Sequence, residues 1–411
     1  MRETLRTWRL LRELRKARSR AEIAALQDAL LRAAVEHAYG TVPFYRRVWD
    51  EHGFDPGGFR GLADLDRIPR IDRANVRAAS PDELLSAGAE VTDRFDTSRS
   101  SGTALSVPRG PAEQRLWRAT GLRMWLEHGY RWADLTVRFD SQAGPSHPLQ
   151  RLGFSRTVWL LEEVPLEDRV ARLLETRPDV VVGTPTELRR VCEALDARGA
   201  ALRPRIVFSQ GEVLPAATRT QVERVLGVSP ADLYGLTEVG YVAWQCECRG
   251  PLHVNAEAYV VEVLRDRRPA LAGELGRVVI TDLRGRTMPL LRYDTGDLAL
   301  AAEAPCECGR PLPLLGRMEG RADGALVRSD GEIVTTRAVV DALGPDGFRV
   351  RQDTDGQIQL EVAPETNAAR LAAELEALLG EPVARTTAIA AQPEAAGKTR
   401  WVVSELRPQL R

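Results

Sequence analysis

Lysine is almost missing from this chain of 411 residues. It occurs only at Lys16 and Lys398, so 55 of the 57 basic residues are Arg. Any lysine in such a background is a candidate for a specific role.

Cysteine is scarce as well: there are five, and four of them form two Cys-x-Cys pairs. This usage does not make a disulfide framework and fits a reducing compartment, so we expect a cytoplasmic location.

Long apolar runs and an excess of one charge are also lacking. No run approaches the roughly 18 apolar residues that a membrane helix needs, so we expect no membrane partner. The basic N-terminal segment has no uninterrupted apolar stretch and is not a secretory signal. The net charge of −1 gives no long-range positive field, which excludes nucleic acid as the main partner. The length and the 44% hydrophobic content predict a globular protein of two or three domains.

The hydrophobic pattern changes along the chain and predicts an α/β fold. Residues 1–90 form a helical, loop-rich entry segment. Between 111 and 208, helical stretches alternate with short apolar runs, which is typical of parallel strands joined by crossover helices. Close β runs after 258 favour antiparallel pairing. We therefore expect a large N-terminal α/β domain over 1–320, with a parallel sheet and a β-rich subdomain, and a small α+β C-terminal domain over 321–411.

Three polar loops carry residue types that suit nucleotide binding. Residues 97–108 form a hydroxyl-rich loop whose backbone amides can donate to phosphate oxygens. In the second loop, Tyr234 can stack on a purine, Thr237 can reach a phosphate and Glu238 can hold Mg²⁺. Asp297 follows a glycine turn and can accept from both ribose hydroxyls. Each loop alone is also compatible with an ordinary turn, so the evidence lies in their order.

The order of these motifs resembles that of the adenylate-forming superfamily of acyl-CoA synthetases, adenylation domains and luciferases. Within it, the phenylacetate–CoA ligase and coenzyme F390 synthetase branch is the most similar, through residues 39–45, 273–276, 288–293 and 306–310. The resemblance runs from about 38 to 400. The motifs in chain order are Ser100-Ser101-Gly102-Thr103, Ser209-Gln210-Gly211-Glu212, Tyr234-Gly235-Leu236-Thr237-Glu238, Tyr293-Asp294-Thr295-Gly296-Asp297, Gly320-Arg321-Ala322-Asp323 and Gly397-Lys398.

The resemblance implies a bound ATP with Mg²⁺, a hinge and a mobile C-terminal lid domain. The implied roles are β/γ-phosphate binding by Ser100, Ser101, Gly102 and Thr103, adenine contacts by Gly211, Glu212, Tyr234 and Gly235, α-phosphate contact by Thr237, Mg²⁺ binding by Glu238, ribose binding by Asp297 and Arg321, the hinge at Asp323, and entry of Lys398 from the C-terminal domain.

Lys398 also has a chemical argument of its own. Attack of a carboxylate on the α-phosphorus builds negative charge on the phosphoryl oxygens, and a compact ammonium can neutralise that charge. A chain that uses Arg at 55 basic positions nonetheless has Lys here. We therefore interpret Lys398 as catalytic together with Thr237 and Glu238.

The predicted function is ATP-dependent adenylation of a small, aromatic carboxylic acid, followed by transfer of the acyl group to CoA or an amine. The phosphate loop continues as residues 104–108 without the second glycine and lysine usual in the family. This departure leaves two alternatives open. One is activation of another oxyanion, such as nitrite for diazotisation of an aryl amine, and the other is a non-catalytic nucleotide-binding homologue. We also expect that the protein forms a homodimer.

Cysteine and histidine form a fourth constellation. Cys246, His253, Cys306 and Cys308 supply the four soft ligands that a closed, tetrahedral Zn²⁺ site needs, with Cys248 as an alternative ligand. Unligated thiols are the other interpretation. A filled site would be structural and would join two segments about 60 residues apart.

The acyl pocket has weaker candidates. His147 lies in a loop after an expected strand, a place where binding residues gather. Tyr241 and Trp244 come just after the Glu238 motif and are candidates by proximity, although core packing explains them equally well.

Overall fold

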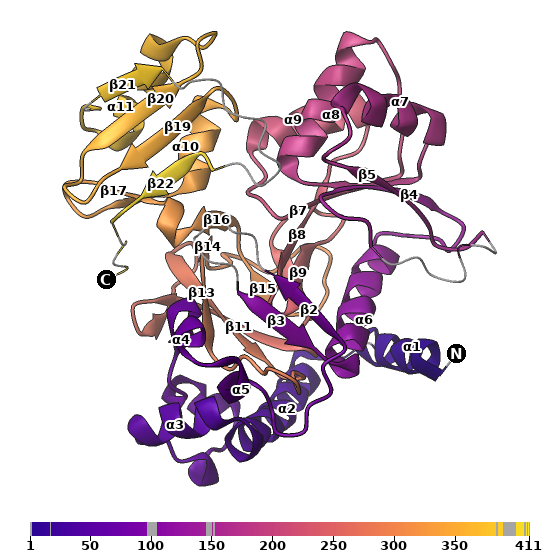
Figure 1. The fold of residues 1–411 in the computed structure, drawn as a ribbon, viewed down its shortest axis with the longest axis vertical. Coiled ribbons are helices and arrows are strands. Elements are labelled where there is room, and N and C mark those ends of the chain that lie inside the picture. Colours follow the sequence, from indigo (N-terminus) through magenta and orange to yellow (C-terminus); the bar gives the residue numbers. More distant parts are fainter. Residues whose placement is uncertain are drawn as a thin grey trace. The chain divides into compact units, whose positions relative to one another are not determined.

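The computed structural model describes residues 2–16, 18–96, 105–144, 150, 153–383, 385–388, 400–406, 408 and 410 (Figure 1). The chain forms two compact units, each built from two segments. The first unit joins Met1–His128 to Tyr234–Arg317, and the second joins Gly129–Leu233 to Met318–Arg411. Among the described helices, none has both the length and the apolar character that crossing a membrane requires.

The first unit begins with a helical segment, drawn in indigo and purple in Figure 1. Ser19 caps the second helix, because its side chain accepts from the Glu22 amide while the Glu22 carboxylate accepts from the Ser19 amide. Buried aromatic side chains, with Trp49 at the centre, form the core of this segment. Its elements are α1 (Arg2–Leu14), α2 (Arg20–Thr41), α3 (Pro43–Glu51), η1 (Pro56–Gly58), η2 (Leu62–Arg67), α4 (Arg73–Ala78) and α5 (Pro81–Leu84).

Three groups of strands complete the first unit. One sheet has the order β1-β14-β13-β11-β12, with β1 parallel to β14 and the other pairs antiparallel. Strand β10 pairs antiparallel with both β9 and β15, and β2 pairs with β3 ahead of helix α6. The bounds are β1 (Ile71–Asp72), β2 (Asp93–Asp96), β3 (Ser106–Arg109), α6 (Pro111–Glu127), β9 (Gly240–Gln245), β10 (Leu252–Val254), β11 (Tyr259–Arg265), β12 (Arg268–Pro269), β13 (Leu275–Asp282), β14 (Tyr293–Leu300) and β15 (Leu314–Leu315).

The second unit contains the parallel sheet that the sequence predicts. Strands β5, β4, β6, β7 and the start of β8 are neighbours in that order, and all pair in parallel. The run 180–182 is almost fully buried because helices cover the sheet. The bounds are β4 (Leu135–Asp140), β5 (Arg156–Leu161), α7 (Leu166–Thr176), β6 (Val180–Gly183), α8 (Pro185–Ala197), β7 (Ile206–Gln210), α9 (Ala216–Leu226) and β8 (Ala231–Leu236).

The C-terminal segment of the second unit carries its own sheet, of order β21-β20-β19-β22, with helices packed on it (Figure 1, yellow). It is joined to the middle segment by polar contacts, since Arg337 Nη1 donates to the Leu214 carbonyl at 2.7 Å. The bounds are β16 (Met318–Arg321), η5 (Ala322–Gly324), β17 (Leu326–Val327), β18 (Ile333–Val334), α10 (Thr336–Leu343), β19 (Phe348–Gln352), β20 (Ile358–Val362), α11 (Ala368–Leu379), β21 (Arg385–Ala388) and β22 (Val402–Ser404).

The predicted α/β class is confirmed, with a parallel sheet and an antiparallel, β-rich part. The division into domains 1–320 and 321–411, and the mobility of the second, stay predictions.

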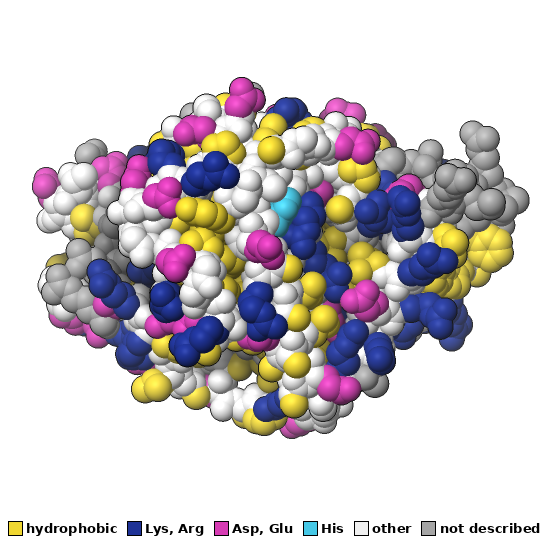
Figure 2. Space-filling model, turned by 90° about the horizontal axis from the view of Figure 1, so that it is seen from below, with side chains coloured by type: hydrophobic (Ala, Val, Ile, Leu, Met, Phe, Trp, Pro, Cys, Tyr) yellow, Lys and Arg dark blue, Asp and Glu magenta, His cyan; other side chains and the backbone are white. Residues whose placement is uncertain are grey.

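On the face shown in Figure 2, basic side chains are interspersed with acidic ones.

Candidate functional site

In the first unit, Tyr234 and Asp297, two of the predicted nucleotide-binding residues, contact each other. Tyr234 lies in β8 and Asp297 in β14, and the Tyr234 hydroxyl donates to Asp297 Oδ2 at 2.8 Å. Both side chains are 8% exposed. Burial, followed by the Asp297 charge, raises the pKa of Tyr234 well above its usual value, so the phenol stays protonated and holds the carboxylate in place.

Glu238, the predicted Mg²⁺ ligand, is half-buried just beyond β8. The Tyr293 hydroxyl donates to its Oε1 at 3.3 Å. Burial and the nearby Glu238 carboxylate raise the pKa of Tyr293, which keeps this donor protonated. The two carboxylates of the predicted nucleotide site, Glu238 and Asp297, are thus each oriented by a buried tyrosine.

Arg109 lies against the turn after β8 that contains Thr237 and Glu238. The sequence alone did not predict a role for it. Its Nη2 donates to the Thr237 carbonyl, and its guanidinium carbon lies 4.4 Å from the Phe95 ring centroid and 3.9 Å from that of Trp117. The side chain is 3% exposed, and its buried Nη1 has no hydrogen-bond partner among the described residues. Burial lowers the pKa of Arg109 to about 10, which leaves it charged at neutral pH.

Gly211 and Glu212, the predicted adenine-lining residues, lie in the second unit just after β7. Gly211 has a φ of +85°, a left-handed conformation that glycine adopts without strain. Glu212 Oε2 accepts from the Thr186 hydroxyl at 2.7 Å and from the Thr186 amide at 3.2 Å. The turn after β7 is therefore tied to the start of α8.

The second unit also pairs the predicted ribose and hinge residues with each other. Arg321 Nε donates to Asp323 Oδ1 at 3.0 Å, and Arg400 Nη2 donates to Asp323 Oδ2 at 3.4 Å. The remaining predicted residues, Ser100, Ser101, Gly102, Thr103, His147 and Lys398, lie outside the described residues, so their roles stay predictions.

The two aromatic pocket candidates differ in their surroundings. Tyr241 is half-buried, and its ring would come within 3.2 Å of a Cβ added at Gly121 of α6. Trp244 is fully buried, with ring centroids 5.8 Å from His128 and 5.3 Å from His253. Trp244 thus packs beside the cysteine–histidine cluster. A role of either residue in an acyl pocket stays a prediction.

The four predicted metal ligands come together in the first unit. The Cys246 and Cys306 sulfurs are 3.4 Å apart, and the Cys308 sulfur is 3.3 Å from His253 Nε2. All four ligand atoms lie within 4.8 Å of one another. Cys248, the alternative ligand, is exposed and does not belong to this cluster.

The chemistry of these four groups fits Zn²⁺. Tetrahedral zinc with bonds of about 2.3 Å to sulfur and 2.0–2.1 Å to nitrogen separates its ligand atoms by roughly 3.4–3.8 Å. Burial lowers the pKa of His253 to about 4, so the imidazole is in the neutral form that binds metals. His253 Nδ1 is buried without a hydrogen-bond partner among the described residues, and the ring is held by packing against Trp244, with the two ring centroids 5.3 Å apart.

Comparison with known proteins identifies relatives over most of the chain. No family model matches it. The chain is 32% identical over 329 residues to a phenylacetate–coenzyme A ligase of Thermus thermophilus, covering 75% of this chain and 72% of the relative. It is 26% identical over 394 residues to a phenylacetate–coenzyme A ligase of Aromatoleum evansii, covering 88% and 87%.

Among solved structures, a 2-hydroxyisobutyryl-CoA ligase in the postadenylation state superposes with a TM-score of 0.73 at 22% identity, covering 92% of this chain and 88% of that one. This likeness confirms the adenylate-forming fold. Together with the first relative, it confirms the resemblance seen in the motifs, and the chain belongs to the phenylacetate–coenzyme A ligase family of AMP-forming ligases.

Proposed function

We propose that this enzyme activates an arylacetic or closely related aromatic acid with ATP and transfers the acyl group to the thiol of CoA. The observation that carries the proposal is the buried pair Tyr234–Asp297 beside the oriented Glu238, in a chain whose relatives are phenylacetate–coenzyme A ligases. The acid and the acceptor are the parts of the proposal that rest on these relatives.

The chemistry has two steps. In the first, a carboxylate oxygen of the acid attacks the α-phosphorus of ATP, and the bond between the α- and β-phosphates breaks to release pyrophosphate. In the second, the thiolate of CoA attacks the acyl carbon of the acyl-AMP, and AMP leaves with the bonding electron pair. Mg²⁺, when bound, neutralises phosphate charge in the first step.

The described residues prepare the site for these steps. Tyr234 keeps Asp297 oriented toward its proposed ribose contact, and Tyr293 keeps Glu238 oriented toward its proposed metal contact. Arg109 holds the Thr237 carbonyl and brings a buried positive charge to the turn that would meet the α-phosphate. In this proposal, Arg109 is a positioning residue. Its charge also contributes positive potential to a site that lacks the lysine usual in the phosphate loop of the family.

The cysteine–histidine cluster is proposed to bind one structural Zn²⁺. Three sulfurs and one nitrogen fill a tetrahedral shell, which leaves no open position for a substrate. The metal would join the turn after β9 and strand β10 to the loop before β15. None of the five cysteines forms a disulfide, which supports the proposal of a reducing, cytoplasmic location.

A screen of pyrophosphate release from Mg-ATP tests the proposal. We expect release to depend on an aromatic acid and the amount of AMP to rise when CoA is present. Release that requires an amine, or nitrite with an aryl amine, would replace the proposed acceptor or substrate. ATP binding without pyrophosphate release under any condition would overturn the proposal in favour of a non-catalytic homologue.

A further inference from the structure

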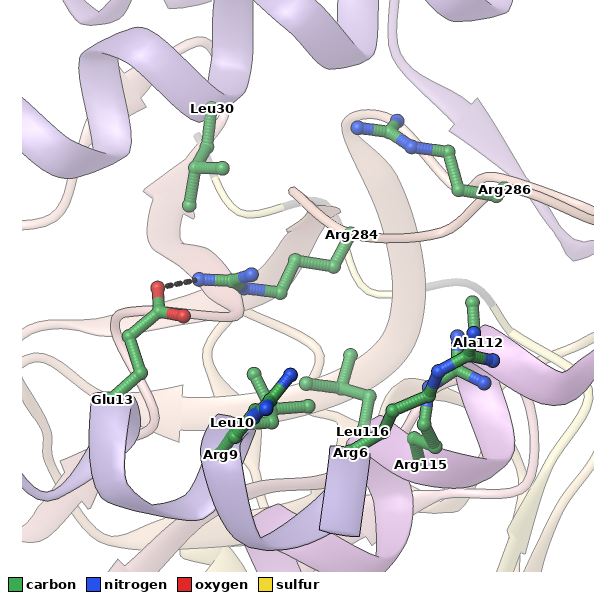
Figure 3. Close-up of a pocket in the computed structure, with 10 residues that line it drawn as sticks. All are labelled: Arg6, Arg9, Leu10, Glu13, Leu30, Ala112, Arg115, Leu116, Arg284 and Arg286. Carbon is green, nitrogen blue, oxygen red and sulfur yellow. Dashed lines mark hydrogen bonds and ion pairs between the residues drawn. The ribbon is translucent and has the colours of Figure 1, made fainter. Parts of the chain in front are cut away.

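A cavity in the first unit is lined by five arginines and by none of the residues assigned above (Figure 3). Its volume is about 420 Å³, within the range of small-molecule sites. We infer that this cavity is a second binding site, for a phosphorylated small molecule. The inference does not rest on the proposed function, because it concerns binding only.

Three separate parts of the chain bring the positive charges together. Arg6 and Arg9 lie on one face of α1, Arg115 projects from α6, and Arg284 and Arg286 belong to the loop after β13. In Figure 3 these side chains surround a common space. Convergence of this kind is not explained by the local pattern of one amphipathic helix.

Only two carboxylates among the described residues accept hydrogen bonds from the guanidinium groups of the cavity. Glu3 accepts from Arg6 at 2.9 Å and from Arg115 at 2.8 Å, and Glu13 accepts from Arg284 at 2.8 Å. Two further carboxylates, Glu113 and Asp282, accept from backbone amides of the loop that carries Arg284 and Arg286 and pair with none of the five guanidinium groups among the described residues.

Arg9 and Arg286 have no ion-pair partner in the described part of the chain. Among the described residues, the Arg286 guanidinium donates only to the neighbouring Gly285 carbonyl, at 3.3 Å. An anion in the cavity would supply the ion-pair partner that these two guanidinium groups lack.

The loop that carries Arg284 and Arg286 is fixed before any ligand arrives. Glu113 Oε1 accepts from the backbone amides of Arg286 and Thr287 at 2.5 and 2.8 Å, and Glu113 Oε2 accepts from the Thr287 hydroxyl at 2.9 Å. The backbone of this loop therefore needs no ordering when an anion binds, which lowers the entropic cost of binding.

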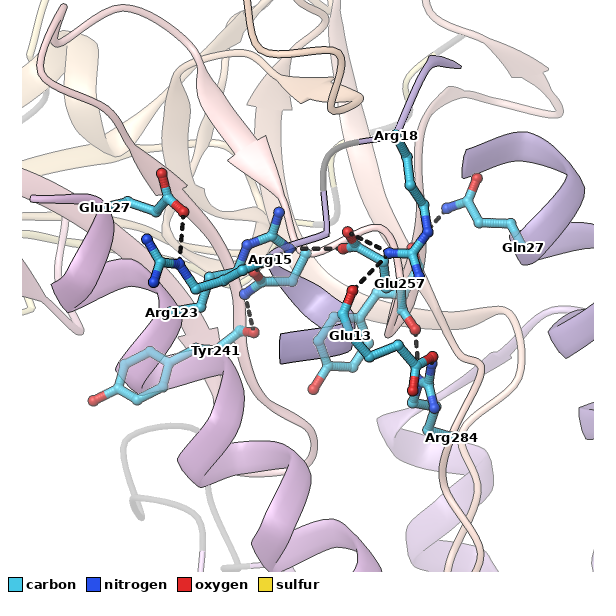
Figure 4. Close-up of polar contacts among 11 residues, drawn as sticks. Glu13, Arg15, Arg18, Gln27, Arg123, Glu127, Tyr241, Glu257 and Arg284 are labelled. Carbon is cyan, nitrogen blue, oxygen red and sulfur yellow. Dashed lines mark hydrogen bonds and ion pairs between the residues drawn. The ribbon is translucent and has the colours of Figure 1, made fainter. Parts of the chain in front are cut away.

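Helix α1 is held in place by buried residues and by charged contacts. Leu11 and Leu14 pack against α6. The segment after α1 adds ion pairs from Arg15 to Glu127 at 3.3 Å and from Arg18 to the buried Glu257 at 3.6 Å (Figure 4). Arg284 joins this network as well, since its Nε donates to the Glu257 carbonyl at 2.7 Å. The cavity wall formed by α1 is thus anchored at several points.

The chemistry of the lining selects the ligand class. Planar guanidinium groups match the oxygens of phosphate, and several of them together favour a dianion over a simple carboxylate. Leu10, Leu30 and Leu116 add apolar surface to the lining, which an uncharged part of the ligand can contact. The ligand is therefore a phosphate ester or a diphosphate of at most nucleotide size. Free pyrophosphate, AMP and the phosphorylated end of CoA share this chemistry.

Equilibrium binding to the full-length protein at constant ionic strength tests the inference, with pyrophosphate, AMP and CoA as separate probes. The test variant is Arg9→Ala/Arg286→Ala. The matched control is Arg12→Ala/Arg267→Ala, which removes the same charge from exposed positions outside the cavity. Any other phosphate site on the protein contributes equally to both variants. We expect at least one probe to lose more than tenfold in affinity in the test variant and less than twofold in the control.

Two results would overturn the inference. One is equal affinity of the two double variants for all three probes, and the other is the absence of saturable binding to the wild type up to about 10 mM, which corresponds to a binding free energy of less than about 2.7 kcal/mol. The probe that responds most strongly identifies the source of the phosphate. Thermal unfolding of both variants within a few degrees of the wild type verifies that the fold is intact.

Discussion

Arg109 provides a test of whether the buried charge at the Thr237 turn serves catalysis or stability. In Arg109→Met, the protein loses a hydrogen bond from a charged donor, about 1.5–3 kcal/mol, and cation–π contacts of about 2 kcal/mol. It also loses a buried cation with no ion-pair partner among the described residues, whose desolvation costs several kcal/mol. These effects oppose each other, so we expect the free energy of unfolding to change by less than about 2 kcal/mol.

The effect on adenylation should be much larger. Removal of a preorganised donor or charge from an active site costs about 10²–10³ in rate, or roughly 3–4 kcal/mol of transition-state stabilisation. We expect kcat/KM for pyrophosphate release to fall by about that factor in Arg109→Met. Arg109→Lys keeps the charge and should recover part of kcat, which a purely structural role would not predict.

Urea unfolding and ATP–pyrophosphate exchange on the same preparations separate the two effects. The reasoning would be refuted if Arg109→Met exchanged pyrophosphate within threefold of the wild type. It would also be refuted if activity and unfolding free energy fell in parallel in both variants.

Three other predictions concern the first unit. Tyr234→Phe removes the donor to Asp297 and should weaken ATP binding about tenfold, as measured by the KM for ATP, with a smaller change in the KM for the acid. Chelation of the Cys246 cluster should release about one equivalent of zinc and lower the unfolding temperature by more than 10 °C, because metal binding is coupled to folding; elemental analysis that finds no zinc in chelator-free protein would contradict this. Burial raises the pKa of Asp282 to about 6 from a usual 3.8, so its protonated form stabilises the fold fully below pH 3.8 and this stabilisation is lost as the pH rises through 6. The free energy of unfolding of Asp282→Asn, relative to that of the wild type, should therefore rise by on the order of 3 kcal/mol from pH 4 to pH 8. Equal differences between variant and wild type at the two pH values would contradict the raised pKa of Asp282.

The fold class and the metal cluster could be predicted from the sequence in more detail than the other sites. Between 111 and 208, where the sequence predicts parallel strands, the apolar runs 135–139 and 180–182 form β4 and β6, because apolar runs between helical stretches have few other solutions. The metal cluster was predictable because soft ligands at close spacing have few alternative roles. Cys248, the alternative ligand, lies in an exposed turn after β9 and outside the cluster.

The other sites could not be predicted as fully, because their residues are far apart in the sequence and come together only in the folded chain. Tyr234 and Asp297 are 63 positions apart, and only the family resemblance placed them together. Arg109 is one Arg among 55, and no pattern around it signals burial between two aromatic rings. The arginine cavity joins α1, α6 and a loop that lies more than 270 positions after α1, so no local motif marks it.

Product stoichiometry tests the central claim most directly. The enzyme is incubated with Mg-ATP, phenylacetate or a related aromatic acid, and CoA, and all products are quantified together. The account predicts equal amounts of pyrophosphate, AMP and acyl-CoA, with none of the three formed when the acid is omitted. Formation of ADP and phosphate, or bound ATP that stays intact with every acid, would contradict it.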